Sequence, residues 1–158
     1  MATMFTRIHK EEFVLRVVLI LALVGMALSL YLTLVHFNSN LGWCPREGEC
    51  EEVWESEYAV ILGIPVALIG LLGYIFIFLL SYLRLYYPDL PMVGNFPTYI
   101  LFLSLVGAAF SVYLTAIEFL VIHAVCDFCF SAFLVMMAIL GLTAYGVLKS
   151  EGDETPKA

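Results

Sequence analysis

Residues 23–33 of this chain read LVGMALSLYLT, and residues 105–115 read LVGAAFSVYLT. The two stretches lie 82 residues apart (105 minus 23) and carry small residues at matching positions. The same offset relates Cys44 to Cys126, so each close cysteine pair begins at the same distance from the same motif. Small residues for close helix packing explain the motif itself, but they do not explain the register of the cysteines. We therefore expect a duplicated helix pair whose two halves have the same orientation.

The composition of the chain requires lipid as the solvent. Of 158 residues, 63% are hydrophobic and 13% are charged, and the mean hydropathy is +0.99. A soluble domain of this size cannot bury so much apolar surface. Helices long enough to cross a hydrocarbon core of about 30 Å are predicted at Phe13–Phe37, Ala59–Leu80, Tyr99–Ile122 and Phe128–Val147. The sequence thus predicts an all-α membrane protein with one four-helix domain, ending in a disordered tail at residues 150–158.

The charged residues predict how the chain is oriented. A net charge of −7 argues against a basic surface that binds the phosphates of nucleic acid. If the chain crosses the membrane four times, Arg46 lies on one side and the other Lys and Arg residues lie on the opposite side: Arg7, Lys10, Arg16, Arg84, Lys149 and Lys157. The positive-inside rule then places both termini in the cytoplasm. We expect both cysteine pairs on the extracytoplasmic side of the cell membrane, where disulfides persist.

Cys126 and Cys129 open the last apolar run as Cys-Asp-Phe-Cys. Their i, i+3 spacing puts both thiols on one face of a helix. At the first turn, the free amides and the helix dipole stabilise a thiolate, whereas apolar neighbours oppose it. Cys126 is nearer the water and Cys129 is one turn deeper. This order favours Cys126 for contact with a protein disulfide and Cys129 for contact with a molecule dissolved in the membrane.

Cys44 and Cys50 enclose a short, turn-rich segment of an acidic loop. Considered alone, this pair suits a structural disulfide, worth about 2–3 kcal/mol, as well as it suits an electron shuttle. A second pair on the same face of the membrane favours the shuttle. A zinc site built from all four thiolates is the competing use. Because the acidic loop offers no nearby histidine, we expect no metal.

In combination, these features resemble the vitamin K epoxide reductase family. The resemblance covers about residues 10–148 and rests on the four spans, the loop cysteine pair and the terminal Cys-x-x-C motif. It includes Ser56, six residues after Cys50, and the Ser-Val-Tyr-Leu sequence at 111–114. Disulfide-bond formation proteins also combine four spans with two cysteine pairs, but they carry Cys-x-x-Cys in the first loop.

The resemblance implies a quinone-linked thiol oxidoreductase that supports disulfide formation in exported proteins. Cys129 would face the quinone, ubiquinone or menaquinone for example, and form a transient adduct. Cys126 would exchange with Cys50, and Cys44 would take electrons from a thioredoxin-like or Dsb-type partner. Ser56 would belong to the catalytic loop and the quinone pocket. The chain stops too soon to hold a fused thioredoxin-like domain, so we expect a separate partner.

The chain departs from the animal enzymes of this family at two places. Those enzymes carry a tyrosine four residues after the last cysteine, where this chain has Phe133. They also carry an asparagine-containing stretch where this chain has Gly63-Ile64-Pro65. Both departures favour reduction of a quinone over reduction of an epoxide.

Further residues are candidates for the pocket. Phe128, Phe133 and Met137 are candidate wall residues, although core or lipid contacts explain them as well. Trp54 and Tyr58 suit a cap over the pocket, and Pro65 is expected to kink the second span.

Quinone reduction consumes protons, so Glu118 near the outer end of the third span is a candidate proton donor. His36 and His123 lie at similar depth, but interfacial positions explain them more simply. The alternative for the whole chain is a non-enzymatic membrane scaffold with two structural disulfides.

Overall fold

The computed structural model describes residues 2–38, 42–43, 49–88 and 95–152. Four helices in this part are long and apolar enough to cross a membrane: Glu12–Phe37, Val66–Tyr86, Phe96–Ile122 and Asp127–Lys149. These spans confirm the predicted all-α membrane bundle. They belong to α1 (Ala2–Phe37), α3 (Val66–Tyr86), α4 (Phe96–Ile117) with its π-helical extension η4 (Glu118–Ile122), and α5 (Asp127–Gly152).

The second span begins at Val66 rather than at Ala59. A short helix α2 (Glu49–Trp54) and a 3-10 turn η2 (Glu57–Ala59) lead into an antiparallel hairpin of β1 (Val60–Ile61) and β2 (Ile64–Pro65). Its two turn residues, Leu62 and Gly63, both have positive φ, at 54° and 83°, as a tight two-residue hairpin turn requires.

Pro65 does not kink the second span, so that expectation is wrong. Its backbone is extended, with φ −58° and ψ 131°, and it directly precedes the helix. The ring therefore interrupts no bond within α3.

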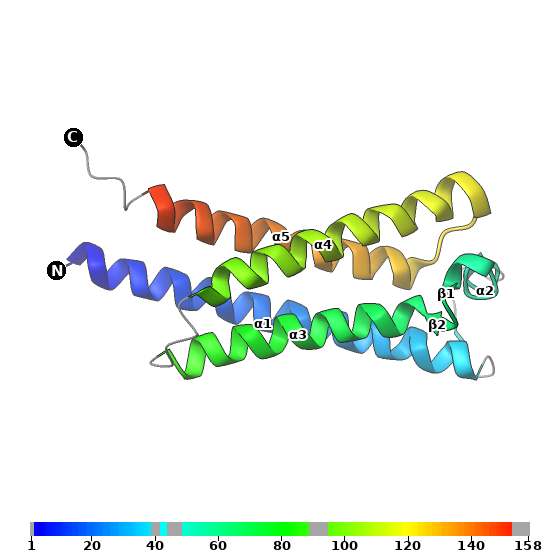
Figure 1. Ribbon diagram of the computed structural model, residues 1–158, viewed down its shortest axis with the longest axis horizontal. Helices are drawn as coiled ribbons and strands as arrows, with labels where there is room; N and C mark the ends of the chain where they lie inside the picture. The colour runs from blue at the N-terminus through cyan, green and yellow to red at the C-terminus, as the bar shows by residue number, and fades with distance from the viewer. Residues whose placement is uncertain (1, 39–41, 44–48, 89–94, 153–158) are drawn as a thin grey trace.

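The helices form a bundle in which α1 packs against α3 and α5, while α4 packs against α5 and α3. Both termini lie at one end of the bundle, and α2, the hairpin and the α4–α5 connection lie at the other (Figure 1). Cys126 belongs to that connection, and the backbone of Cys50 belongs to α2. The predicted gathering of cysteine-bearing segments at one end is therefore confirmed for the described residues. Cys44 and the side chain of Cys50 lie outside them.

The repeated motif brings helices into close contact in each half. A Cβ on Gly25 of α1 would overlap the ring of Tyr74 on α3. In the second half, a Cβ on Gly107 of α4 would lie 2.8 Å from the terminal methyl of Met136 on α5. The repeat-related glycines Gly25 and Gly107 thus have the same role in packing, because each allows the first helix of its pair to approach the second.

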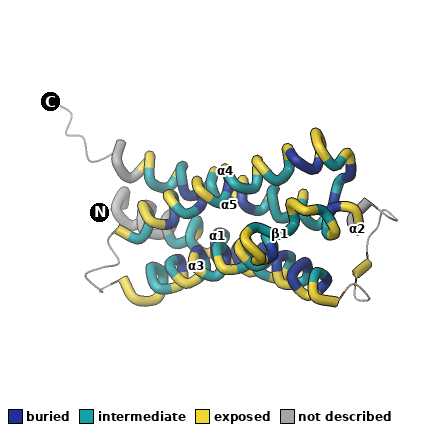
Figure 2. Tube along the Cα trace, turned by 45° about the vertical axis from the view of Figure 1, so that its right-hand side comes forward, coloured by how far each residue is buried: buried dark blue, intermediate teal, exposed yellow. Residues whose placement is uncertain are grey.

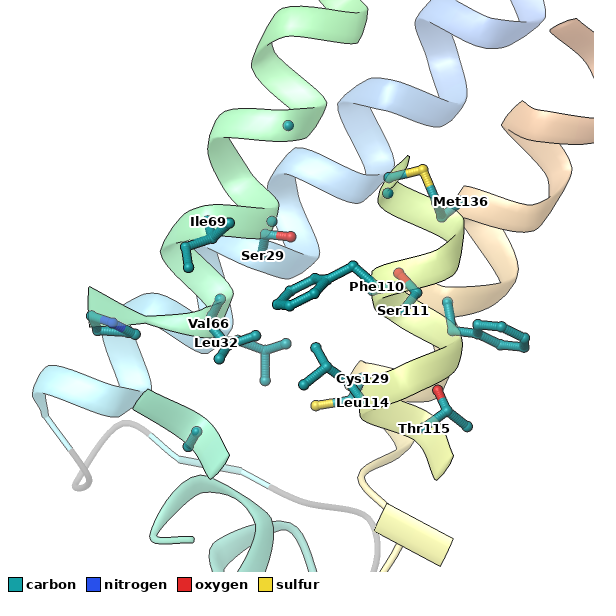
Figure 3. A pocket seen from close by; sticks show the side chains of 18 of the residues that line it. Ser29, Leu32, Val66, Ile69, Phe110, Ser111, Leu114, Thr115, Cys129 and Met136 are labelled. Atoms are coloured by element: carbon teal, nitrogen blue, oxygen red, sulfur yellow. The ribbon is translucent and has the colours of Figure 1, made fainter. Parts of the chain in front are cut away.

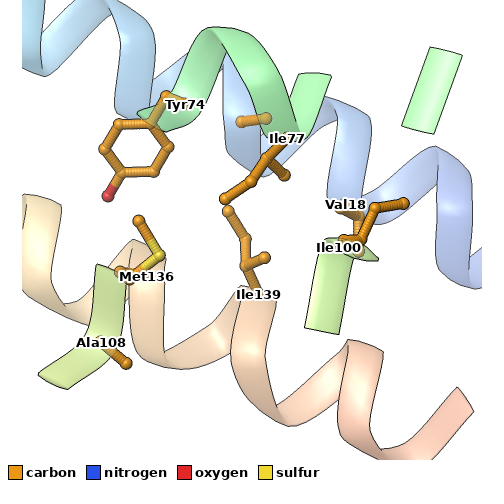
Figure 4. Packing of buried hydrophobic residues seen from close by; sticks show 8 residues of the cluster. Val18, Tyr74, Ile77, Ile100, Ala108, Met136 and Ile139 are labelled. Atoms are coloured by element: carbon orange, nitrogen blue, oxygen red, sulfur yellow. The ribbon is translucent and has the colours of Figure 1, made fainter. Parts of the chain in front are cut away.

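Two buried residues from each spanning helix meet in the main core: Val18, Ala22, Tyr74, Ile77, Ile100, Ala108, Met136 and Ile139 (Figure 4). The Tyr74 hydroxyl also donates a 2.7 Å hydrogen bond to the carbonyl of Ala132, which ties α3 to α5. Only 17–28% of the positions in each span are buried, and exposed positions recur along every helix (Figure 2). Large apolar side chains such as Ile20 and Phe102 occupy the outward faces, where lipid replaces water.

Candidate active site

An apolar cavity of about 410 Å³ lies between the four helices at the end that α2 and the hairpin cover. Residues related by the internal repeat line it from α1 and α4: Ser29 with Ser111, Leu32 with Leu114, and His36 with Glu118. Helices α3 and α5 supply the other walls, including Ile69 and Met136 (Figure 3). The cavity therefore lies between the two halves of the duplication.

The two cysteines of the Cys-x-x-Cys motif take different positions at this cavity. Cys129, in the first turn of α5, lines it and projects into the space between Leu32 and Leu114 (Figure 3). Cys126 immediately precedes α5 and is fully buried, with no exposed surface. Its sulfur accepts a hydrogen bond of 3.3 Å from the backbone amide of Cys129. This is the bond by which a capping side chain satisfies a free amide of the first helical turn.

Hydrogen bonds to its sulfur lower the pKa of Cys126 below the ordinary thiol value of 9.0. The largest cause is a hydrogen bond from the Cys129 side chain, and the Cys129 amide adds to it. Burial and the charge of Glu118 oppose the shift. The lowered pKa agrees with the thiolate expected at a helix N-terminus, and it makes Cys126 a good leaving group in thiol–disulfide exchange.

Glu118 connects the third span to the cysteines. Its carboxylate oxygen Oε2 accepts a 3.3 Å hydrogen bond from the backbone amide of Cys126, and the residue lines the same cavity as Cys129. The residue is only 5% exposed and lines the cavity. It opens the π-helical turn η4, which ends at His123 in the left-handed conformation with φ 58°. Single π-helical turns are frequent at functional sites.

Helix α2 forms a cap over the dithiol: its Val53 is buried in one cluster with Cys126, and Cys129 packs against the same cluster. Val53 of α2 belongs to one buried cluster with Leu32, Ala124 and Cys126, and Trp54 packs against it. Ser56 donates a 2.7 Å hydrogen bond to the carbonyl of Val53, which closes the end of α2. Cys50 stands three positions before Val53 in the same short helix. The segment that carries a loop cysteine is therefore also the segment that lies over Cys126.

The predicted pocket residues divide into two groups. Ser56, Glu118, Cys129 and Phe133 line the cavity. Phe128 is not among the lining residues; its ring lies 4.8 Å from that of Tyr31, between centroids, beside the dithiol. Met137 is not among them either and is 39% exposed on the outer side of α5.

The residue that sequence reasoning missed on α5 is Met136. It lines the cavity together with Cys129, Ala132 and Phe133. These residues are spaced as i, i+3, i+4 and i+7, which is one face of a helix. Counting that period from Cys129 would have identified Met136.

A four-helix membrane protein with a buried and a half-buried cysteine thiol at the covered end of an apolar cavity is, by class, a membrane thiol oxidoreductase. The model of the vitamin K epoxide reductase family matches residues 16–144, which is most of the chain. The chain belongs to that family.

Proposed function

We propose that this protein passes electrons from a thioredoxin-like partner to a membrane quinone and thereby supports disulfide formation in exported proteins. One observation carries the proposal: Cys129 lines an apolar cavity, while Cys126 lies under the cap that contains Cys50. A dithiol in this position can react with a lipid-soluble molecule on one side and a protein thiol on the other.

The cavity has the properties that a quinone ring requires. Its volume of about 410 Å³ falls within the range of about 300–1,000 Å³ that is typical of small-molecule sites. Apolar side chains such as Phe110, Leu114 and Phe133 supply most of its wall. Phe133 offers no hydroxyl for a ring oxygen, which again favours a quinone over an epoxide as the substrate. The site lies within the spans, where a lipid-soluble quinone is concentrated.

The relay conserves electrons at each step. The partner's dithiol becomes a disulfide as it reduces the Cys44–Cys50 disulfide, and this pair then reduces a disulfide between Cys126 and Cys129. In each exchange a thiolate attacks a disulfide sulfur, and a second thiolate resolves the mixed disulfide. Finally, the Cys126 and Cys129 thiols lose two electrons and two protons and form an S–S bond. The quinone gains both electrons and both protons and becomes a quinol.

Anaerobic mixing of the purified, reduced protein with ubiquinone or menaquinone tests the last step. We expect loss of quinone absorbance together with loss of protein thiols, with one quinol formed per dithiol. Cys129→Ala should abolish this reaction. Cys44→Ala should leave it intact and block oxidation of a thioredoxin-like partner.

Normal quinone turnover by the Cys129→Ala variant would contradict the scheme. The alternative, a scaffold with two structural disulfides, makes a different prediction. Reductant would then change the stability of the protein, but the quinone absorbance would stay constant with every variant.

A further inference from the structure

Glu118 is a buried acid in a membrane-spanning segment. Burial of a carboxylate costs free energy, and ionisable residues within spans are therefore candidates for a function. Among the described residues, no Lys or Arg forms an ion pair with its carboxylate. The carboxylate does accept a hydrogen bond from the Cys126 amide. A carboxyl group in this position is a candidate for general acid–base chemistry.

Glu118 lies beside the dithiol. Its carboxylate accepts a 3.3 Å hydrogen bond from the backbone amide of Cys126, and Glu118 lines the same cavity as Cys129. One carboxylate thus adjoins both the dithiol and the space proposed for the substrate. The π-helical turn that begins at Glu118 belongs to the same local arrangement.

Other titratable groups border the cavity from the elements packed around it. They are His36 on α1, Tyr58 in η2 and Tyr74 on α3. The Tyr74 hydroxyl already donates a hydrogen bond to the Ala132 carbonyl. Neither His36 nor Tyr58 forms a hydrogen bond with Cys126 or Cys129, whereas Glu118 accepts one from the Cys126 amide.

We propose that the Glu118 carboxylate takes the proton from the Cys129 thiol and delivers it to a quinone oxygen in the cavity. The inference rests on the proposed quinone reduction. Glu118 is regenerated as a carboxylate when the quinol oxygen has been protonated, so it carries a proton without net consumption. The electron pair comes from the dithiol as its S–S bond forms. The second proton reaches the other quinol oxygen from the aqueous side, balancing the one that Cys126 releases.

The decisive variant is Glu118→Gln. Glutamine keeps a carbonyl oxygen that can accept the Cys126 amide, but it cannot take a proton from a thiol. General acid–base catalysis typically contributes about 10²–10⁴-fold, so we expect single-turnover quinone reduction near neutral pH to slow by about 100-fold. The defect should shrink as pH rises, because Cys129 then loses its proton to hydroxide. Glu118→Asp should restore part of the rate.

Matched measurements separate proton transfer from structure. Glu12→Gln makes the same substitution at a half-buried position near the other end of the bundle and should leave the rate and its pH profile unchanged. Exchange of the oxidised Cys126–Cys129 pair with dithiothreitol needs no quinone, so it should proceed normally in Glu118→Gln and also reports that the variant is folded. Wild-type quinone reduction should be slower in D₂O than in H₂O.

Two results would overturn the inference while leaving the proposed function intact. One is a wild-type rate and pH profile in Glu118→Gln. The other is a loss that is independent of pH and equally large in dithiothreitol exchange, which would make Glu118 a positioning residue only. If Glu118→Gln does not fold, an absent solvent isotope effect in the wild type overturns the inference instead. Failure of the wild-type protein to reduce any quinone, with dithiol exchange intact, would remove the proposed function itself.

Discussion

At the scale of single residues, the reactivity of the dithiol depends on what surrounds each sulfur. Cys126 receives hydrogen bonds from Cys129 and has a lowered pKa, whereas Cys129 faces an apolar cavity. Two cysteines one helical turn apart are therefore chemically unequal. The inequality would give an order to the proposed relay, since Cys126, with its lowered pKa, is the better leaving group.

Trp54 adds a smaller effect on the same sulfur. Its buried indole N–H meets no acceptor at hydrogen-bond geometry among the described residues, yet it lowers the pKa of Cys126 as the last of several causes. The interaction of the indole with the Cys126 sulfur is therefore weaker than a formed hydrogen bond.

Trp54→Phe should therefore raise the pKa of Cys126 while leaving it below that of a free thiol, because the Cys129 hydrogen bonds remain. The pH midpoint of Cys126 ionisation, followed by the ¹³Cβ chemical shift of the labelled cysteine, should move to higher pH. Trp43→Phe is the matched control, since Trp43 is 68% exposed. An unchanged midpoint in Trp54→Phe would show that the indole has no influence on the thiolate.

At the scale of helices, the duplication is a packing device. Gly25 and Gly107 occupy equivalent positions of the repeat, and each is in contact with the second helix of its own pair. The contacts differ in kind. Gly25 lies against the rigid ring of Tyr74, whereas Gly107 lies against the flexible end of Met136.

Gly25→Ala should therefore destabilise the bundle, by about 1–3 kcal/mol, as expected for an overpacked core. Gly107→Ala should cost less, because the methionine can adopt another rotamer. Gly141→Ala is the control for helix propensity, since its Cβ would meet nothing within 4 Å. Thermal unfolding in detergent measures all three, and equal midpoints for Gly25→Ala and Gly141→Ala would refute this account of the repeat.

The hairpin is the element that sequence reasoning did not find. Residues 59–65 are apolar and continue directly into α3, so hydropathy alone assigns them to the second span. What separates them is the backbone, with Leu62 and Gly63 in positive φ and Pro65 extended. Apolar composition indicates that a segment lies in lipid or in the protein core, but it does not indicate whether the backbone is a helix or a hairpin.

At the scale of the whole molecule, both cysteine-bearing segments of the described chain lie at the same end of the bundle (Figure 1). We propose that this end faces away from the cytoplasm, on the basis of the Lys and Arg distribution. A relay between exported proteins and a membrane quinone requires this orientation.

Cysteine labelling in intact cells or oriented vesicles tests the orientation. In a background with all four native cysteines replaced by serine, Leu62→Cys should react with a membrane-impermeant maleimide from outside, because Leu62 is 98% exposed at the hairpin tip. Tyr87→Cys, at the other end of α3, should react only after the membrane is permeabilised. The reverse pattern would contradict the proposed topology.

The sequence by itself determined the number of membrane spans, the spacing of the cysteine pair and the internal repeat. Four spans follow from apolar runs that match the thickness of a bilayer, and the redox chemistry follows from Cys126 and Cys129 at one helical turn. The repeat offset also relates Cys44 to Cys126. These properties depend on residues close in sequence or on a count along the chain.

Only the tertiary structure decided which groups meet. It showed that the face of α5 that carries Cys129, and with it Met136 rather than Met137, borders the cavity. It placed Val53 against Cys126 and brought the Glu118 carboxylate to the Cys126 amide. Such contacts depend on how helices from both halves of the chain pack, and packing is a property of the whole bundle.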